Sequence, residues 1–149
     1  IPCVWKEDQI VDKPVKIGGK DYRITLVNLG NPHCVVFSEK VDAVDVATVG
    51  PLFENCEYFP ERINAEFIRV VNKVTIKMRV WERGNGETWS CGTGAAAAVV
   101  AAVLNGYCDR DTNITVKLRG GDLVVNYHSN GEVELMGSVK TVYEGKFEI

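Results

Sequence analysis

The feature that most constrains the fold is a run of small apolar residues at positions 95–104. The run contains only alanine, valine and leucine, so a helix built from it has no polar face to turn toward water. Glycines at 92 and 94 precede the run, and the Asn105-Gly106 pair that follows is typical of a helix end. The run is too short to cross a bilayer as a helix. It therefore predicts a core helix over about residues 94–105 that other elements surround on all sides.

The rest of the chain predicts short strands and one weak helix. Segment 42–55 has roughly the spacing of an amphipathic helix, which Gly50-Pro51 would shorten or break. Alternating or continuous apolar segments, separated by glycine-containing turns, predict strands at 15–17, 22–26, 34–37, 67–71, 73–81, 114–118, 123–127, 133–136 and 139–143. We therefore predict an α+β fold: one domain over residues 1–149, with a curled, mostly antiparallel β-sheet wrapped around one central apolar helix.

Size and charge narrow the function classes. A chain of 149 residues is long enough to bury one core of its own. Its net charge of −3 gives no reason to expect nucleic acid or an anionic membrane as a partner. The sequence contains neither a phosphate-binding loop of the Walker type nor a dinucleotide fingerprint, because Gly84-x-Gly86 lacks the third glycine. A nucleotide-binding function is therefore disfavoured.

The five cysteines, at positions 3, 34, 56, 91 and 108, are odd in number and irregular in spacing. They form neither a C-x-x-C pair nor a zinc-type cluster with histidine, so we expect no disulfide framework and no metal site. Free thiols favour a reducing, cytoplasmic location. The chain opens without an initiator methionine or a signal-peptide pattern, and we interpret it as an excised or processed piece.

Cys91 is the best candidate for chemistry. A glycine-rich loop after the 73–81 strand places it immediately before Gly92-Thr93-Gly94, at the predicted start of the apolar helix. The first N–H groups of a helix have no partner inside the helix, and their field favours the thiolate, which is the reactive form of cysteine. A free cysteine is also often a mere packing residue. The position beside Ser90 and the two glycines favours a reactive thiol beside a bound carboxylate.

The other polar candidates are weaker when taken alone. Glu82 and Arg83 could form an exposed ion pair, or a carboxylate that tunes the thiol and an arginine that binds substrate. His33, in the turn after Asn31-Pro32, is structural unless it approaches a thiol. Asn64 could satisfy loop backbone or bind a polar ligand. Two further residues are expected to be inactive: Cys34, buried in a strand, and His128, solvated in a turn.

Taken together, these segments resemble the second half of the diaminopimelate epimerase family. The most specific match is Glu82-Arg83-Gly84-x-Gly86-Glu87-Thr88-x-x-Cys91-Gly92-Thr93-Gly94-Ala95. The other matching segments, in order along the chain, are 30–35, 59–60 with 64–67, 120–123, 136–138 and 144–145. The resemblance covers about residues 27–145.

The resemblance implies a cofactor-independent epimerase of lysine and peptidoglycan precursor synthesis. The family fold is a pair of similar halves, each a sheet around a central helix, with the active site between them. Each half supplies one cysteine: one thiolate removes the α-proton of LL- or meso-2,6-diaminopimelate, and the other thiol returns a proton to the opposite face. By resemblance, Cys91 is the thiol of the second half, and His33 and Glu82 orient and tune the thiols. The distal end of the substrate is held by Asn31, Asn64, Glu82 and Arg83. The reacting carboxylate is held by the backbone of Cys91, Gly92 and Thr93.

The sequence departs from the family in that the first half, with its own cysteine motif, is absent. We therefore expect residues 1–149 to be the C-terminal half, which folds but does not epimerise alone. The expected partners are the amino-acid substrate and the missing N-terminal half, and a homodimer of the full-length enzyme is left open. The alternatives are a racemase of another amino acid with the same fold, a phenazine-type isomerase, which Cys91 argues against, and a non-catalytic binding module.

Overall fold

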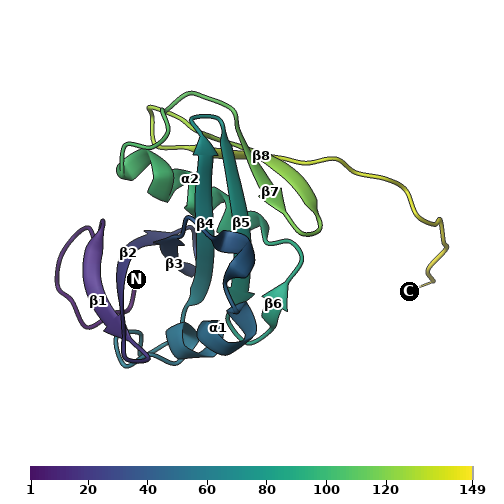
Figure 1. Cartoon of the computed structure of the whole chain (residues 1–149). Helices are drawn as coiled ribbons and strands as arrows, with labels where there is room; N and C mark the ends of the chain where they lie inside the picture. Colours follow the sequence, from purple (N-terminus) through teal and green to yellow (C-terminus); the bar gives the residue numbers. More distant parts are fainter. Residues whose placement is uncertain (149) are drawn as a thin grey trace.

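The computed structural model describes residues 1–148, in which the strands form one mixed sheet and two α-helices pack against it (Figure 1). The elements are β1 (Lys13–Ile17), β2 (Lys20–Asn28), β3 (Pro32–Phe37), the 3-10 helix η1 (Val41–Ala43), α1 (Val46–Glu54), β4 (Asn64–Asn72), β5 (Thr75–Glu82), β6 (Gly86–Thr88), α2 (Gly92–Leu104), β7 (Ile114–Leu118), β8 (Gly121–Tyr127) and β9 (Val133–Met136). The strand order is β1-β2-β3-β4-β5-β7-β8-β9, and β6 pairs with β5. The pairs β3–β4 and β5–β7 are parallel and the others antiparallel, which confirms the α+β, mostly antiparallel prediction.

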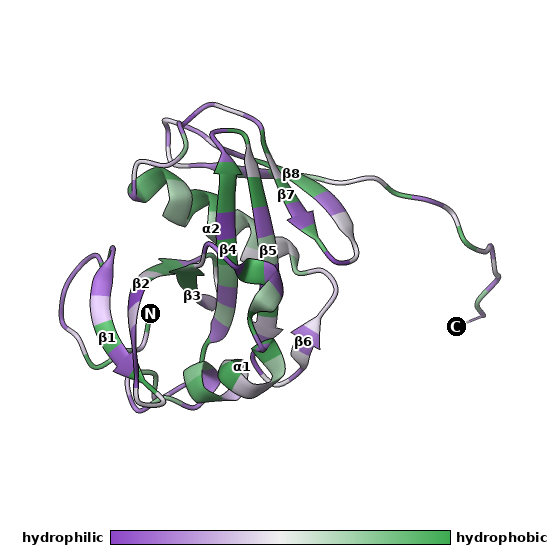
Figure 2. Cartoon of the chain, in the orientation of Figure 1, coloured by the Kyte–Doolittle hydropathy of each residue, from purple (hydrophilic) through white to green (hydrophobic). Residues whose placement is uncertain are grey.

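Helix α2 lies inside the curve of this sheet. Residues 94–102 are all buried, and only the two ends of the helix, Gly92 and Thr93 at the start and Val103 and Leu104 in the last turn, reach solvent. The helix packs against β2, β3, β4, β5, β7, β8 and β9, so the sheet must bend around it. Figure 2 shows the hydrophobic colouring along α2 and along the strands beside it. Alanine suits this position because a small side chain lets strands approach the helix axis closely.

A second apolar core lies on the opposite face of the sheet, under α1. Its largest fully buried members are Phe53, Phe59, Phe67, Ile24 and Ile63. Strands β3 and β4 run between the two cores, so alternate residues face opposite ways. Both strands are therefore buried on both faces and read as continuous apolar runs. Helix α1 starts where the Asp45 side chain accepts the Thr48 N–H, and Pro51 does not interrupt it.

One strand prediction is wrong. Residues 137–148 form no strand, and β9 at Met136 is the last element of the described chain. Val139, Val142, Tyr143 and Phe147 are more than 80% exposed, and Figure 1 shows this segment running away from the sheet. A strand needs a neighbour for its backbone hydrogen bonds, and the described residues offer none beyond β9. The apolar pattern of this segment is real, but within residues 1–148 the segment pairs with no strand.

Other boundaries differ in detail. Strand β4 begins at Asn64, before the predicted 67, and the short strand β6 was not predicted. Both differences concern polar residues that the fold draws into the sheet beside the 82–91 loop. Among residues 1–148, no helix has the length and apolar character that a bilayer crossing would need.

Candidate active site

Cys91 occupies the N-cap of α2, as the sequence predicts. Its Sγ accepts the N–H of Gly94 at 3.3 Å and lies 3.7 Å from Thr93 Oγ1. The residue is buried, with 8% of its surface exposed. A Cβ added at Gly94 would lie 3.0 Å from Glu66 Oε1 and 3.1 Å from Cys91 Sγ. Position 94 therefore suits glycine, because the thiol and a carboxyl group would both crowd a larger side chain there.

A line of hydrogen bonds connects the turn before β3 to the start of α2. The Asn31 side-chain amide donates to Thr93 Oγ1 at 3.3 Å, and Asn31 Oδ1 lies 2.9 Å from His33 Nε2. His33 Nδ1 in turn lies 2.7 Å from Glu66 Oε1. Since Thr93 contacts the Cys91 thiol, the structure brings Asn31, His33, Thr93 and Cys91 into one network.

Glu66 is a member of this network to which the sequence analysis assigned no role. Its side chain is fully buried, and Oε2 has no hydrogen-bond partner in the described chain. Burial raises the pKa of Glu66 above its ordinary value, although His33 opposes the shift and the charge of Glu82 adds to it. The signal that could have found it is a carboxylate inside the apolar run 65–68, since a buried charge must be paired or neutral.

Glu82 ends β5 close to the thiol. Its carboxylate accepts the hydroxyl of Thr88, and its charge raises the pKa of Cys91. Within the described residues, Glu82 forms no ion pair with Arg83, so the exposed-pair interpretation of these two residues fails. The Glu82 carboxylate instead binds Thr88 and lies near enough to the start of α2 for its charge to act on Cys91.

Asn64 and Arg83 are joined to each other rather than to the thiol network. The Arg83 backbone N–H donates to Asn64 Oδ1 at 2.9 Å, and the Asn64 amide donates to the Pro32 carbonyl at 2.8 Å. The Arg83 guanidinium donates to the Glu61 carbonyl at 3.0 Å, which leaves its other N–H groups free. Asn64 thus ties the loop at 83 to the turn that carries His33.

Glu54, at the end of α1, is a second residue that the sequence analysis missed. Its carboxylate accepts the Trp81 indole N–H at 2.7 Å, the Gly84 backbone N–H at 2.8 Å and the Arg62 guanidinium at 3.0 Å. Burial alone would raise the pKa of Glu54, but these hydrogen bonds outweigh burial and hold the pKa below its ordinary value. Glu54 therefore binds the residues on either side of the Glu82-Arg83 dipeptide, Trp81 and Gly84, from the α1 side of the sheet.

We expect Glu54→Ala to lower the free energy of unfolding by about 1–3 kcal/mol, because it removes the partner of the partly buried Trp81 N–H and of the Gly84 N–H. Urea denaturation of the 149-residue chain, followed by circular dichroism, measures the change. Glu57→Ala, at an exposed position of the following turn, is the matched control and should shift stability by no more than about 0.5 kcal/mol. Equal effects of the two substitutions would contradict the role of Glu54.

The ionisation of Cys91 corrects a sequence-based expectation. Burial raises the pKa of the thiol above its ordinary value, the hydrogen bonds from Gly94 and Thr93 lower it, and the charge of Glu82 raises it. The helix-start N–H does act in the predicted direction. Desolvation together with the charge of Glu82 outweighs it, so the pKa of the thiol lies above its ordinary value.

Alkylation checks this result. We expect the iodoacetamide reaction of Cys91 to be slow at pH 7 and to accelerate up to and beyond pH 9, because only the thiolate reacts. Glu82→Gln removes a nearby negative charge, so it should lower the thiol pKa and speed the reaction at pH 8. Cys34, whose pKa burial raises still further, is the internal control and should stay unmodified. A rate that is flat between pH 7 and 9, or slower in Glu82→Gln, would contradict the assignment.

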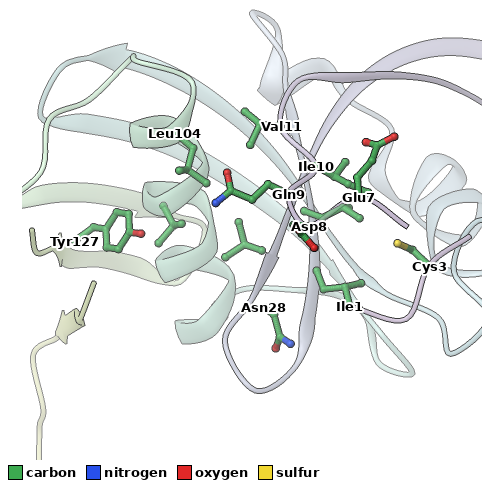
Figure 3. Close-up of a pocket in the computed structure, with 13 residues that line it drawn as sticks. Ile1, Cys3, Glu7, Asp8, Gln9, Ile10, Val11, Asn28, Leu104 and Tyr127 are labelled. Atoms are coloured by element: carbon green, nitrogen blue, oxygen red, sulfur yellow. The ribbon is translucent and has the colours of Figure 1, made fainter. Parts of the chain in front are cut away.

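The remaining candidates lie elsewhere. Cys34 is fully buried in the second core, as predicted, while His128 is half-buried with Asp111 and Glu134 each 3.5 Å from its ring. A cavity of about 270 Å³ lies between the N-terminal segment and the end of α2, with Gln9, Asn28, Leu104 and Tyr127 among its lining (Figure 3). None of the predicted site residues lines this cavity, so it is separate from the thiol network.

Comparison with known proteins gives one consistent family. Residues 25–142 match the protein-family model described as diaminopimelate epimerase. The chain is 48% identical over 147 residues to the diaminopimelate epimerase of Pelotomaculum thermopropionicum, covering 99% of this chain and 52% of that protein. It is 46% identical to that of Bacillus licheniformis, with 95% and 50% covered, and 42% identical to that of Leptospira biflexa, with 100% and 53% covered. The chain thus spans about half the length of the curated relatives it matches.

Solved structures agree on the fold. A PhzF-family phenazine biosynthesis protein of Bacillus anthracis aligns with a TM-score of 0.53 at 19% identity, covering 83% of this chain and 40% of that one. A predicted epimerase of Pseudomonas aeruginosa aligns with a TM-score of 0.50 at 16% identity, with 85% and 47% covered. At these identities the likeness is one of fold alone, and it again matches less than half of the longer chain.

Proposed function

The chain belongs to the diaminopimelate epimerase family, and on that premise we propose that it is the C-terminal half of a cofactor-independent epimerase that interconverts LL- and meso-2,6-diaminopimelate. The observation that carries the proposal is the Cys91 thiol at the N-cap of a buried helix, connected through Thr93 and Asn31 to His33. Packing alone does not require this series of polar side chains around a cysteine, whereas an acid–base site needs polar groups of this kind to position and tune the thiol.

The chemistry needs such a thiol. An amino-acid α-proton is very weakly acidic, and without an electron-withdrawing cofactor the site must stabilise the carbanion with fixed dipoles and the exclusion of water. One sulfur, as thiolate, takes the α-proton and becomes a thiol. A second thiol on the opposite face gives its proton to the carbanion and becomes a thiolate. Cys91 supplies one of these groups, and the second comes from the N-terminal half.

The raised pKa of Cys91 suggests which role it starts from. Burial and the nearby Glu82 carboxylate favour the protonated form of this sulfur. In that form Cys91 is ready to give a proton to the carbanion in one direction of the reaction, while the sulfur of the other half acts as the base. In the reverse reaction the roles exchange, because each sulfur ends the turnover in the state opposite to the one in which it began.

Substrate binding follows from the two ends of the site. The first-turn N–H groups at Gly92 and Thr93 have no partner inside the helix and suit the reacting α-carboxylate. Asn31, Asn64, Glu82 and Arg83 hold the distal amino-acid end, and the free N–H groups of Arg83 suit its carboxylate. His33 and Glu82 orient and tune the thiols.

The partners follow from the same proposal. This chain works with the N-terminal half that completes the cleft and with the small amino-acid substrate, in the cytoplasm, where its free cysteines stay reduced. The reaction belongs to the synthesis of lysine and of peptidoglycan precursors. Two copies of the full-length enzyme can still associate without changing this assignment.

Proton exchange in deuterated water tests the proposal. We expect the complete enzyme to remove the α-proton NMR signal of both LL- and meso-diaminopimelate, and to leave a panel of other amino acids unchanged. The 149-residue chain alone, the matched control, should exchange none of them. Exchange confined to another amino acid would replace the substrate by that one, and the absence of any exchange would overturn the enzymatic proposal.

A further inference from the structure

His33 and Glu66 meet because β3 and β4 are parallel neighbours. The register pairs His33 with Asn64 and Val35 with Glu66. Since side chains alternate along a strand, His33 points to the same face as Val35, and Glu66 to the same face as Ile68, which is the α2 face. Both side chains are fully buried, and Oε1 of Glu66 lies 2.7 Å from Nδ1 of the ring.

The hydrogen bonds of Asn31 fix one ring nitrogen. The Asn31 amide nitrogen donates to Thr93, so its oxygen is the atom that faces His33 Nε2 at 2.9 Å. A carbonyl oxygen only accepts, and therefore Nε2 carries a hydrogen. Two states satisfy this requirement. Either a charged ring gives its Nδ1 hydrogen to an ionised Glu66, or a neutral ring accepts a hydrogen from a protonated Glu66.

Burial selects between these states. Oε2 of Glu66 has no partner in the described chain, and the side chain has no exposed surface. An orphaned oxygen costs far more on a carboxylate than on a carboxylic acid, because the charge must be desolvated as well. The nearby Glu82 carboxylate also disfavours a second negative charge. The neutral state is therefore favoured.

We propose that Glu66 is a positioning residue that, as a neutral carboxylic acid, donates a hydrogen bond to Nδ1 and holds His33 as the Nε2–H tautomer, facing Asn31 and the start of α2. The effect on turnover rests on the proposed function, whereas the tautomer does not. The Nε2–H group is thereby aimed along the line that ends at the Cys91 thiol. Glu66 also lies against Gly94, so one carboxyl group sets both the ring and the first turn of α2.

Nitrogen-15 NMR of the complete enzyme labelled at histidine tests the tautomer. The His33 signals are identified as those lost in His33→Gln. We expect a protonated Nε2 and an unprotonated, hydrogen-bonded Nδ1. Glu66→Gln should preserve this pattern, because its amide N–H also donates, whereas Glu66→Met should abolish it. Two protonated ring nitrogens in the unmodified enzyme, or an unchanged tautomer in Glu66→Met, would overturn the proposal. The first of these results needs no variant to fold.

Kinetics measure the consequence for turnover. In Glu66→Met we expect kcat to fall about tenfold or more, a part of the about 10²–10⁴-fold that a positioned acid–base group contributes, while Glu66→Gln stays within about threefold. KM should change less than kcat in both variants. An equal loss of kcat in Glu66→Gln and Glu66→Met, with the NMR pattern retained in Glu66→Gln, would overturn the positioning role. The expected tautomer in an enzyme that does not turn over diaminopimelate would overturn the proposed function and leave the Glu66 assignment standing.

Discussion

Replacing Cys91 with alanine in the complete enzyme should lower kcat for diaminopimelate by about 10²–10⁴-fold, the share of a group that moves a proton in the transition state. The thiol is the one titratable hydrogen that the N-cap of α2 presents, and alanine can neither take nor give it. KM should change far less, because the first-turn N–H groups that suit the α-carboxylate belong to the backbone. Steady-state assays in both directions measure the two constants.

Cys56→Ala is the matched control for this experiment. Cys56 is half-buried and packs against the second core, on the face of the sheet opposite α2. We expect its kcat to stay within about twofold, since cysteine there acts only as a small apolar group. A Cys91→Ala enzyme with the activity of Cys56→Ala would show that the thiol is a packing residue.

Phe53→Ala should lower the free energy of unfolding of the 149-residue chain by about 3–5 kcal/mol, the usual cost of emptying a buried phenylalanine site. Phe53 lies on α1 with no exposed surface and packs edge to face against Tyr22 and Phe67. It joins α1 to the face of β4 opposite Glu66. Urea denaturation followed by tryptophan fluorescence measures the loss.

Phe147→Ala supplies the comparison. Phe147 is 89% exposed in the segment after β9, so the same substitution should change stability by no more than about 0.5 kcal/mol. A loss at Phe53 as small as that at Phe147 would mean that the second core does not stabilise the chain. In that case the positions of Glu54 and of the 82–84 loop would need another explanation.

The central helix could be predicted from sequence because its composition is compatible only with a helix that is buried on all sides. A helix from 95 to 104 without a polar face must be surrounded, and short alternating strands are what surrounds it. The side of the sheet away from α2 was harder to predict. Residues 42–55 carry a weak amphipathic pattern broken by Gly50-Pro51, and no local signal says that Phe53 and Phe67 pack together across a long stretch of sequence.

The candidate site likewise contains residues whose placement follows from local sequence and residues whose placement depends on long-range contacts. Cys91, Gly92 and Thr93 are contiguous, so their placement at a helix start follows from local sequence. Glu66 and Glu54 act through partners from 27 to 33 residues away, namely His33 for Glu66 and Trp81 and Gly84 for Glu54. The register of β3 and β4 and the packing of α1 against β5 bring these partners together. Long-range pairing of this kind leaves no periodic trace in the sequence.

The protonation state of Cys91 shows why a local rule can give the wrong sign. The field of a helix N-terminus favours the thiolate, and the Gly94 N–H provides that effect. Burial by the surrounding strands and the charge of Glu82 outweigh it. Desolvation and neighbouring charge together set a pKa, and neither can be predicted from the residues that flank the cysteine.

The most direct test of the account is a crystal structure of the complete enzyme with bound α-methyl-diaminopimelate, which lacks the α-hydrogen at one centre and so does not react there. We expect the sulfur of Cys91 to lie in van der Waals contact with the methylated α-centre, about 4 Å from its nearest atom, with the α-carboxylate on the N–H groups at the start of α2. A ligand whose α-carbon lies far from the Cys91 sulfur would contradict the role of Cys91 as the acid–base group.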